Sequence, residues 1–126
     1  MQAVLCDDFD ESRVADVPRP DPSADEALVE VSRVQLSVTE CALYRGRKIR
    51  HHEEVKDRLA DAPARLFGHE FCGTVVETGS DVTGVDVGDR VYAPSKINCG
   101  DCPYCDSGYP QYCKDTESLG YTVPGT

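Results

Sequence analysis

Several features that define common functional classes are missing from this sequence. No hydrophobic run approaches the length of a membrane-spanning helix, and the first residues lack the basic and apolar regions of a signal peptide. Lysine is scarce, with 4 residues beside 9 arginines, and the net charge is −10. Because a nucleic-acid surface needs a basic stripe, nucleic acid is excluded as a partner. We therefore expect a cytoplasmic domain without membrane or nucleic-acid contacts.

The surplus of acidic residues also predicts the environment of the protein. There are 23 acidic side chains and 13 basic ones. An acid-rich, lysine-poor surface is typical of salt-loving organisms, because concentrated salt screens the repulsion between the charges. This composition favours a halophilic protein, and an acidic protein from an ordinary organism is the alternative.

The pattern of apolar and turn-forming residues predicts a single, mainly β domain. Short strands are expected at 2–6, 13–17, 26–36, 70–78 and 90–93, with a further strand starting at 118–123. Residues 37–44 change to a helical period, and Gly46 ends this short helix. The charged stretch 47–65 is expected to be a surface loop with a helical turn or two. Short strands with regular turns indicate a barrel-like architecture.

Four cysteines lie close together near the end of the sequence. Cys99, Cys102, Cys105 and Cys113 follow the spacing C-x2-C-x2-C-x7-C. Such short steps direct several thiolates at one tetrahedral point, which is typical of a zinc site. Four protein ligands leave no open position, so this zinc would serve folding of a lobe over residues 94–116. Two disulfides or a rubredoxin-like iron centre are the alternatives, and the odd total of 7 cysteines argues against a disulfide scaffold.

A second motif lies about thirty residues upstream of the cysteines. It reads G-H-E-x2-G-x5-G-x2-V and comprises Gly68, His69, Glu70, Gly73, Gly79 and Val82. With the cysteine lobe, it resembles the zinc signature of the medium-chain alcohol and polyol dehydrogenases. The resemblance implies a GroES-like barrel with a catalytic zinc, for which His69 is a ligand and Glu70 a ligand or near neighbour. It also implies NAD(P)-linked oxidation of a small alcohol or polyol to a carbonyl.

The sequence departs from that family's pattern in one segment. Counting back from the Arg45-Gly46 turn places Ser37 where the family has a cysteine ligand of the catalytic zinc. Thr39 falls on the hydroxyl that relays the alcohol proton, and Glu40 replaces an aspartate beside the metal. A hydroxyl is a much poorer zinc ligand than a thiolate. Three outcomes are open: Ser37 binds zinc weakly or through water, Cys41 replaces it, or the catalytic site holds no metal.

The resemblance also implies that these residues form only part of an enzyme. Family members add a Rossmann domain that binds NAD or NADP, and no G-x-G-x-x-G occurs here. We therefore expect residues 1–126 to be an incomplete GroES-like domain, inactive alone and homo-oligomeric when full length. A truncated, non-catalytic zinc-binding module with a decayed active site is the alternative. A zinc-free quinone reductase of the same superfamily fits less well, because it would leave the four cysteines without a purpose.

Other candidate residues carry weaker signals. His51 and His52 could belong to a proton relay, but solvated surface histidines are the simpler interpretation. Cys6 and Cys72 are expected to be small buried apolar residues. The remaining aromatic candidates are expected to pack around the zinc lobe: Tyr104, Tyr109 and Tyr112.

Overall fold

The computed structural model describes all of residues 1–126, and strands dominate it. The strands are β1 (Gln2–Asp8), β2 (Glu11–Asp16), β3 (Ala27–Val34), β4 (Phe71–Thr78), β5 (Arg90–Tyr92), β6 (Lys96–Ile97) and β7 (Glu117–Ser118). The helices are α1 (Val38–Tyr44), α2 (His52–Asp61) and α3 (Pro103–Asp106), followed by the 3-10 turn η1 (Pro110–Tyr112). This content confirms the mainly β prediction. None of the helices is long and apolar enough to cross a bilayer.

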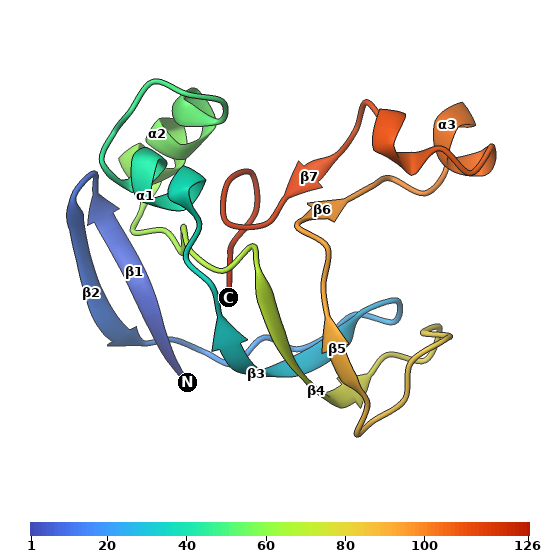
Figure 1. The fold of residues 1–126 in the computed structure, drawn as a ribbon. Helices are drawn as coiled ribbons and strands as arrows, with labels where there is room; N and C mark the ends of the chain where they lie inside the picture. The colour runs from blue at the N-terminus through green and yellow to red at the C-terminus, as the bar shows by residue number, and fades with distance from the viewer.

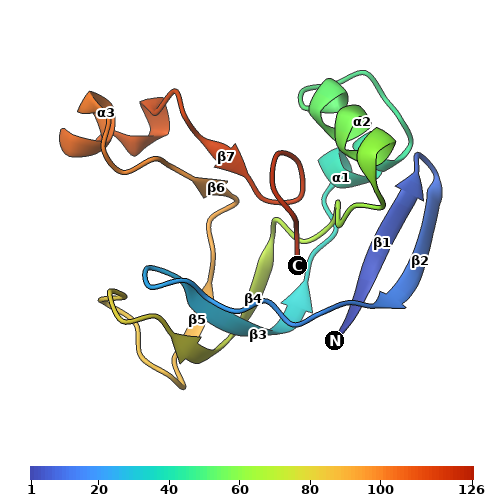
Figure 2. The ribbon, with the colours of Figure 1, turned by 180° about the vertical axis from the view of Figure 1, so that it is seen from behind.

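The strands pair in three antiparallel sheets. β1 pairs with β2, β6 pairs with β7, and β4 lies between β3 and β5. Figure 1 shows α1 and α2 beside the β1–β2 hairpin, whereas α3 and the cysteine lobe project at the opposite end of the molecule. The view from behind shows the segment after β7 turning back between these two regions, where the chain ends (Figure 2). Residues from both halves of the sequence therefore meet at the centre.

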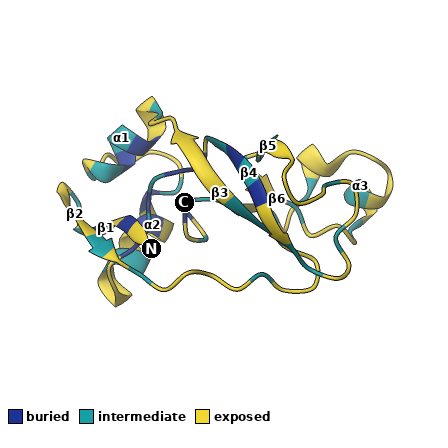
Figure 3. Cartoon of the chain, turned by 90° about the horizontal axis from the view of Figure 1, so that it is seen from below, coloured by how far each residue is buried: buried dark blue, intermediate teal, exposed yellow.

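The hydrophobic core lies where the two main helices meet β1 and the last residues. Its buried members are Cys6, Leu43, Val55, Ala64, Leu66 and Tyr121. Cys6 is fully buried, as expected, whereas Cys72 is half-buried in β4. Burial is confined to this region and parts of β4, and the cysteine lobe is largely exposed (Figure 3). β3 adds no fully buried residue to this core, and its residues Val31 and Val34 remain exposed.

The helical turn or two expected within the surface loop over 47–65 is longer in the structure, because α2 occupies ten of these residues. Val55 is fully buried, and Leu59, one helical turn later, packs against the core. Glu53 and Glu54 stand in the first turn, where negative charge interacts favourably with the helix dipole. The charged residues of α2 outnumber its apolar residues, so the sequence of this helix resembles that of a surface loop.

The strand expected at 118–123 is also wrong beyond its first residue. β7 ends at Ser118, whose carbonyl accepts backbone hydrogen bonds from Tyr121 (3.1 Å), Thr122 (3.0 Å) and Val123 (3.3 Å). Gly120 allows this tight loop because it adopts a φ of +78°. We call residues 118–123 the Tyr121 loop. Its shape directs the Tyr121 side chain into the centre of the molecule.

The signature residue Gly73 is required by close strand packing. It lies opposite Val31 of β3 and Val91 of β5. A Cβ atom at this position would stand 2.3 Å from the Glu30 carbonyl oxygen and 2.6 Å from Val29 Cγ1. Because the first neighbour is backbone, the contact is relieved only by separating the strands.

We expect Gly73→Ala to lower the free energy of unfolding by about 1–3 kcal/mol, measured by denaturant titration. Gly84→Ala is the control, since a Cβ there meets no atom within 4 Å and only its φ of +87° is strained. Its expected cost is about 1 kcal/mol. A Gly73→Ala variant as stable as the natural chain would show that the strands do not pack this closely.

Candidate functional site

The four lobe cysteines converge in space. Their Sγ atoms all lie within 4.8 Å of one another, with 3.6 Å between Cys102 and Cys105 and 3.5 Å between Cys99 and Cys113. Sulfur atoms bound to one tetrahedral zinc at about 2.3 Å are separated by about 3.8 Å. Disulfide sulfurs would be about 2.05 Å apart, and all of these cysteines are free. The donor set therefore fits a closed zinc site and does not fit two disulfides.

Within the cluster, Cys113 is easier to ionise than Cys99 and Cys105, whose pKa values are raised. A hydrogen bond from the Cys99 backbone is the main cause that lowers the pKa of Cys113 to about 6. A hydrogen bond with the Asp101 backbone lowers the pKa of Cys99. Hydrogen bonds with the side chains of Asp101 and Cys113 outweigh it and raise this pKa to about 12. A thiolate at Cys113 beside neighbouring thiols is a suitable starting point for binding a cation. The three lobe tyrosines contact one another, with ring centroids 6.1 and 6.5 Å apart, and stay exposed.

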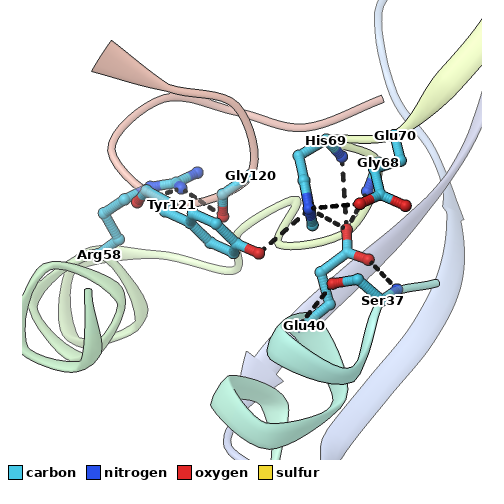
Figure 4. Close-up of polar contacts among 8 residues, drawn as sticks. All are labelled: Ser37, Glu40, Arg58, Gly68, His69, Glu70, Gly120 and Tyr121. Carbon is cyan, nitrogen blue, oxygen red and sulfur yellow. Dashed lines mark hydrogen bonds and ion pairs between the residues drawn. The ribbon is translucent and has the colours of Figure 1, made fainter. Parts of the chain in front are cut away.

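The second candidate site begins at the N-terminus of α1. Ser37 is the N-cap: its hydroxyl accepts a hydrogen bond of 3.1 Å from the Glu40 backbone. In return, the Ser37 backbone N–H donates to Glu40 Oε2 at 2.7 Å, which completes a capping box (Figure 4). Ser37 therefore stands beside the site with one of its acceptor positions used by the helix.

Glu40 connects this helix to the G-H-E motif. Its side chain is fully buried, and Oε1 accepts the Gly68 backbone N–H at 2.8 Å. The same oxygen lies 2.9 Å from Nδ1 of His69. A carboxylate only accepts hydrogen bonds, so its closeness favours the tautomer that carries the proton on Nδ1. Nε2 of His69 then keeps its lone pair, as a metal ligand must.

The free nitrogen of His69 faces Glu70. Nε2 lies 3.4 Å from Glu70 Oε1. Two donors bound to one tetrahedral metal at 2.0–2.1 Å are separated by about 3.4 Å, so this pair fits a shared metal ion. His69 is buried, whereas Glu70 is exposed. The pair thus combines a fixed imidazole with a carboxylate that substrate or water can reach.

Two hollows meet at His69. One has a volume of about 360 Å³ and is lined by Thr39, Ile49, Arg50, His51, His69, Ser95, Lys96, Ser118 and Tyr121. The other, of about 660 Å³, lies over β4 and β5 and includes His69, Glu70, Cys72 and Tyr92 among its lining residues. Thr39 and His69 share the smaller hollow, whereas Glu70 lines the larger one. Cys41 and Ser37 line neither of them.

Tyr121 is a site residue that sequence reasoning missed. Its hydroxyl lies 3.1 Å from His69 Nδ1, and burial followed by the charge of Glu40 raises its pKa to about 12. The phenol therefore stays neutral over the physiological range. Tyr121 stands 52 residues from His69 and belongs to no local motif, so no spacing signal could have identified it.

The expectation that His51 and His52 are solvated is wrong. His52 is buried and stacks on Phe9 with ring centroids 5.3 Å apart. His51 is mostly buried and stacks on Tyr121 at 5.2 Å. Both rings are held between helix α2 and its neighbours, because α2 begins here and packs on the core. His51 thus joins Tyr121 and His69 in one column of rings along the smaller hollow.

Comparison with known proteins identifies the family of this chain. Residues 23–126 match the family model of the alcohol dehydrogenase GroES-like domain. L-threonine 3-dehydrogenase of Xanthomonas axonopodis pv. citri is 36% identical over 109 residues, which cover 86% of this chain and 30% of that protein. The chain therefore spans about a third of the length of such relatives.

Solved structures share the fold over the whole chain. Alcohol dehydrogenase TADH from Thermus sp. ATN1 is 31% identical with a TM-score of 0.78, covering 100% of this chain and 35% of that one. A zinc-binding dehydrogenase from Sinorhizobium meliloti 1021 bound to NADP is 30% identical with a TM-score of 0.74, covering 99% and 33%. The chain belongs to the GroES-like domain family of the zinc-containing medium-chain alcohol dehydrogenases.

Proposed function

We propose that residues 1–126 are the zinc-binding catalytic domain of a longer enzyme that oxidises an alcohol to a carbonyl with NAD or NADP. The observation that carries this proposal is the pairing of His69 Nε2 with Glu70 Oε1 at 3.4 Å beside a hollow lined by Thr39. The cysteine lobe serves folding, since its four donors leave no open position. The cofactor would be bound by the part of the enzyme outside these residues, and the NADP-bound relative supports that assignment.

The roles of individual side chains follow from their chemistry and position. Zinc held by His69 and Glu70 would act as a Lewis acid that lowers the pKa of an alcohol hydroxyl. Thr39 has a hydroxyl at the same hollow, from which it can accept the alcohol proton and pass it on. Glu40 holds the His69 imidazole in one tautomer. Ser37 would complete the metal site only weakly, because its oxygen already caps α1.

The smaller hollow also bears on the substrate. Arg50 and Lys96 line it, neither makes an ion pair within the chain, and no carboxylate side chain lines it. This charge distribution favours an alcohol that carries a negatively charged group over one that carries only a positive group. L-threonine, named in the relatives' activity, carries a carboxylate and an ammonium group on the carbon beside its secondary alcohol, so it has a negatively charged group of this kind.

The direct test is an activity assay on the longer protein that contains these residues. We expect alcohol-dependent reduction of NAD or NADP, which His69→Ala abolishes and zinc chelation suppresses. A folded, zinc-loaded protein without activity toward neutral or anionic alcohols would contradict the proposal. It would favour a non-catalytic zinc-binding module, an alternative that the capped Ser37 hydroxyl supports.

Replacement of Ser37 by cysteine separates an impaired catalytic site from a decayed one. A thiolate is a stronger zinc ligand than a hydroxyl, so Ser37→Cys should tighten zinc binding at His69 and Glu70 by at least tenfold. The measurement is a zinc titration against a chelator, with Ser32→Cys on the exposed end of β3 as the control. Unchanged zinc binding in Ser37→Cys would indicate that the site no longer forms.

A further inference from the structure

A single arginine of α2 holds the Tyr121 loop in place. Nη1 of Arg58 donates hydrogen bonds to the carbonyls of Gly120 (3.2 Å), Tyr121 (2.8 Å) and Val123 (3.1 Å). Arg58 makes no ion pair with any carboxylate of the chain. Within the chain, the charged guanidinium of Arg58 therefore interacts with backbone carbonyls and not with carboxylates. Hydrogen bonds from a charged donor are stronger than those from a neutral donor.

The loop held in this way places one aromatic ring against His69. Figure 4 shows Arg58 on one side of the loop and the Tyr121 hydroxyl pointing to the imidazole on the other. The two rings lie 5.2 Å apart at a tilt of 46°, and the hydroxyl is 3.1 Å from Nδ1. Tyr121 also stacks on His51, with ring centroids 5.2 Å apart. Tyr121 is only 7% exposed, so this position is closely confined.

The Tyr121 hydroxyl approaches the same ring nitrogen of His69 as Glu40 does, since Nδ1 lies 2.9 Å from Glu40 Oε1 and 3.1 Å from the Tyr121 hydroxyl. Glu40 Oε1 is shared among Nδ1, the Gly68 backbone N–H and the more distant His69 N–H. A contact shared in this way leaves the imidazole some freedom to rotate about its Cβ–Cγ bond. Tyr121 closes the side that faces the smaller hollow, where no other hydrogen bond to the His69 ring exists.

We propose that Tyr121 and Arg58 are positioning residues for His69: Tyr121 confines the imidazole so that Nε2 faces Glu70, and Arg58 holds the loop that carries Tyr121. This inference rests on the proposed metal-binding role of His69. Outer partners of a metal-bound histidine typically change metal affinity by 10–100-fold. We expect about tenfold weaker zinc binding at this site for Tyr121→Phe and for Arg58→Met, with zinc at the cysteine lobe unchanged.

The test uses the 126-residue chain with two readouts. The first is zinc affinity at the His69 site, titrated after the cysteine lobe is filled. The second is the imidazole ¹⁵N chemical shifts of His69, which report its tautomer and rotational order without metal at that site. Tyr44→Phe is the matched control, because its hydroxyl contacts Ser12 and not His69. Arg65→Met is the control for Arg58→Met, since the Arg65 side chain makes no hydrogen bond or ion pair.

The outcomes distinguish this inference from the proposed function. Altered His69 shifts in Tyr121→Phe and Arg58→Met, but not in the controls, support the positioning role. If the natural chain binds no second zinc while the shifts still change, the positioning role stands and the catalytic metal site fails. Shifts and zinc affinity unchanged in both variants overturn the inference, provided that the melting temperatures show all chains to be folded.

Discussion

Replacement of Cys105 by serine is expected to lower the zinc content by one ion per chain and to disorder the lobe around it. No residue of α3 or η1 is buried, so no apolar core holds this region together. Its order must come from the metal, and structural zinc sites contribute about 10–16 kcal/mol of binding free energy. Serine is nearly the same size as cysteine, and the loss therefore reflects the missing thiolate and not a change in packing.

Elemental analysis after dialysis measures the zinc, and amide hydrogen exchange over residues 94–116 measures the order. Cys72→Ser is the matched control, since it removes a thiol from β4 outside the lobe. We expect that variant to keep the lobe zinc and its protection from exchange. Equal zinc in Cys105→Ser and the natural chain would show that the four cysteines do not form one metal site. Iron in place of zinc would favour the rubredoxin-like alternative.

Replacement of Glu40 by alanine is expected to lower the free energy of unfolding by about 2–5 kcal/mol, because each buried donor left without an acceptor costs about 1–3 kcal/mol. The change deprives Gly68 N–H and Ser37 N–H of their acceptor and leaves His69 Nδ1 without its closest partner. These groups lie in a region that water enters poorly, so the lost hydrogen bonds are not replaced. The free energy is measured by denaturant titration at neutral pH.

Glu40→Gln separates the contribution of the charge from that of the shape. The amide fills the same space and keeps one oxygen acceptor, but its NH2 group cannot accept a hydrogen bond. We expect a loss of about 1–2 kcal/mol, because only some of the contacts remain. Glu30→Ala, on the exposed surface of β3, should change stability by less than about 0.5 kcal/mol. A Glu40→Ala variant as stable as Glu30→Ala would mean that Glu40 does not organise the site.

The four-cysteine cluster and the family could be predicted because their signals are local. Cys99, Cys102 and Cys105 are separated by two residues each, and the chain itself brings their donors together. His69 and Glu70 are neighbours for the same reason. Gly73 could be recognised from its place in the motif, although only the packed strands show that backbone from β3 leaves no room for a side chain.

The helical and loop content was harder to predict where charge hides a narrow buried stripe. In α2 two apolar residues face the core, and the other positions are mostly charged or small. The segment after β7 resembled a strand because its apolar residues alternate with others. Gly120 and the Ser118 carbonyl instead close it into a loop, because backbone hydrogen bonds there form within the segment and not to a neighbouring strand.

The sequence alone therefore determined which atoms can bind metal, and the tertiary structure decided what holds them in place. Glu40 is 28 residues from Gly68, Tyr121 is 52 residues from His69, and Arg58 is 63 residues from Tyr121. No spacing pattern connects residues so far apart, because their contacts exist only once α1, α2 and the Tyr121 loop pack on one another. Coordination depends on donors that the backbone holds together, whereas the orientation of the imidazole depends on the folded surroundings.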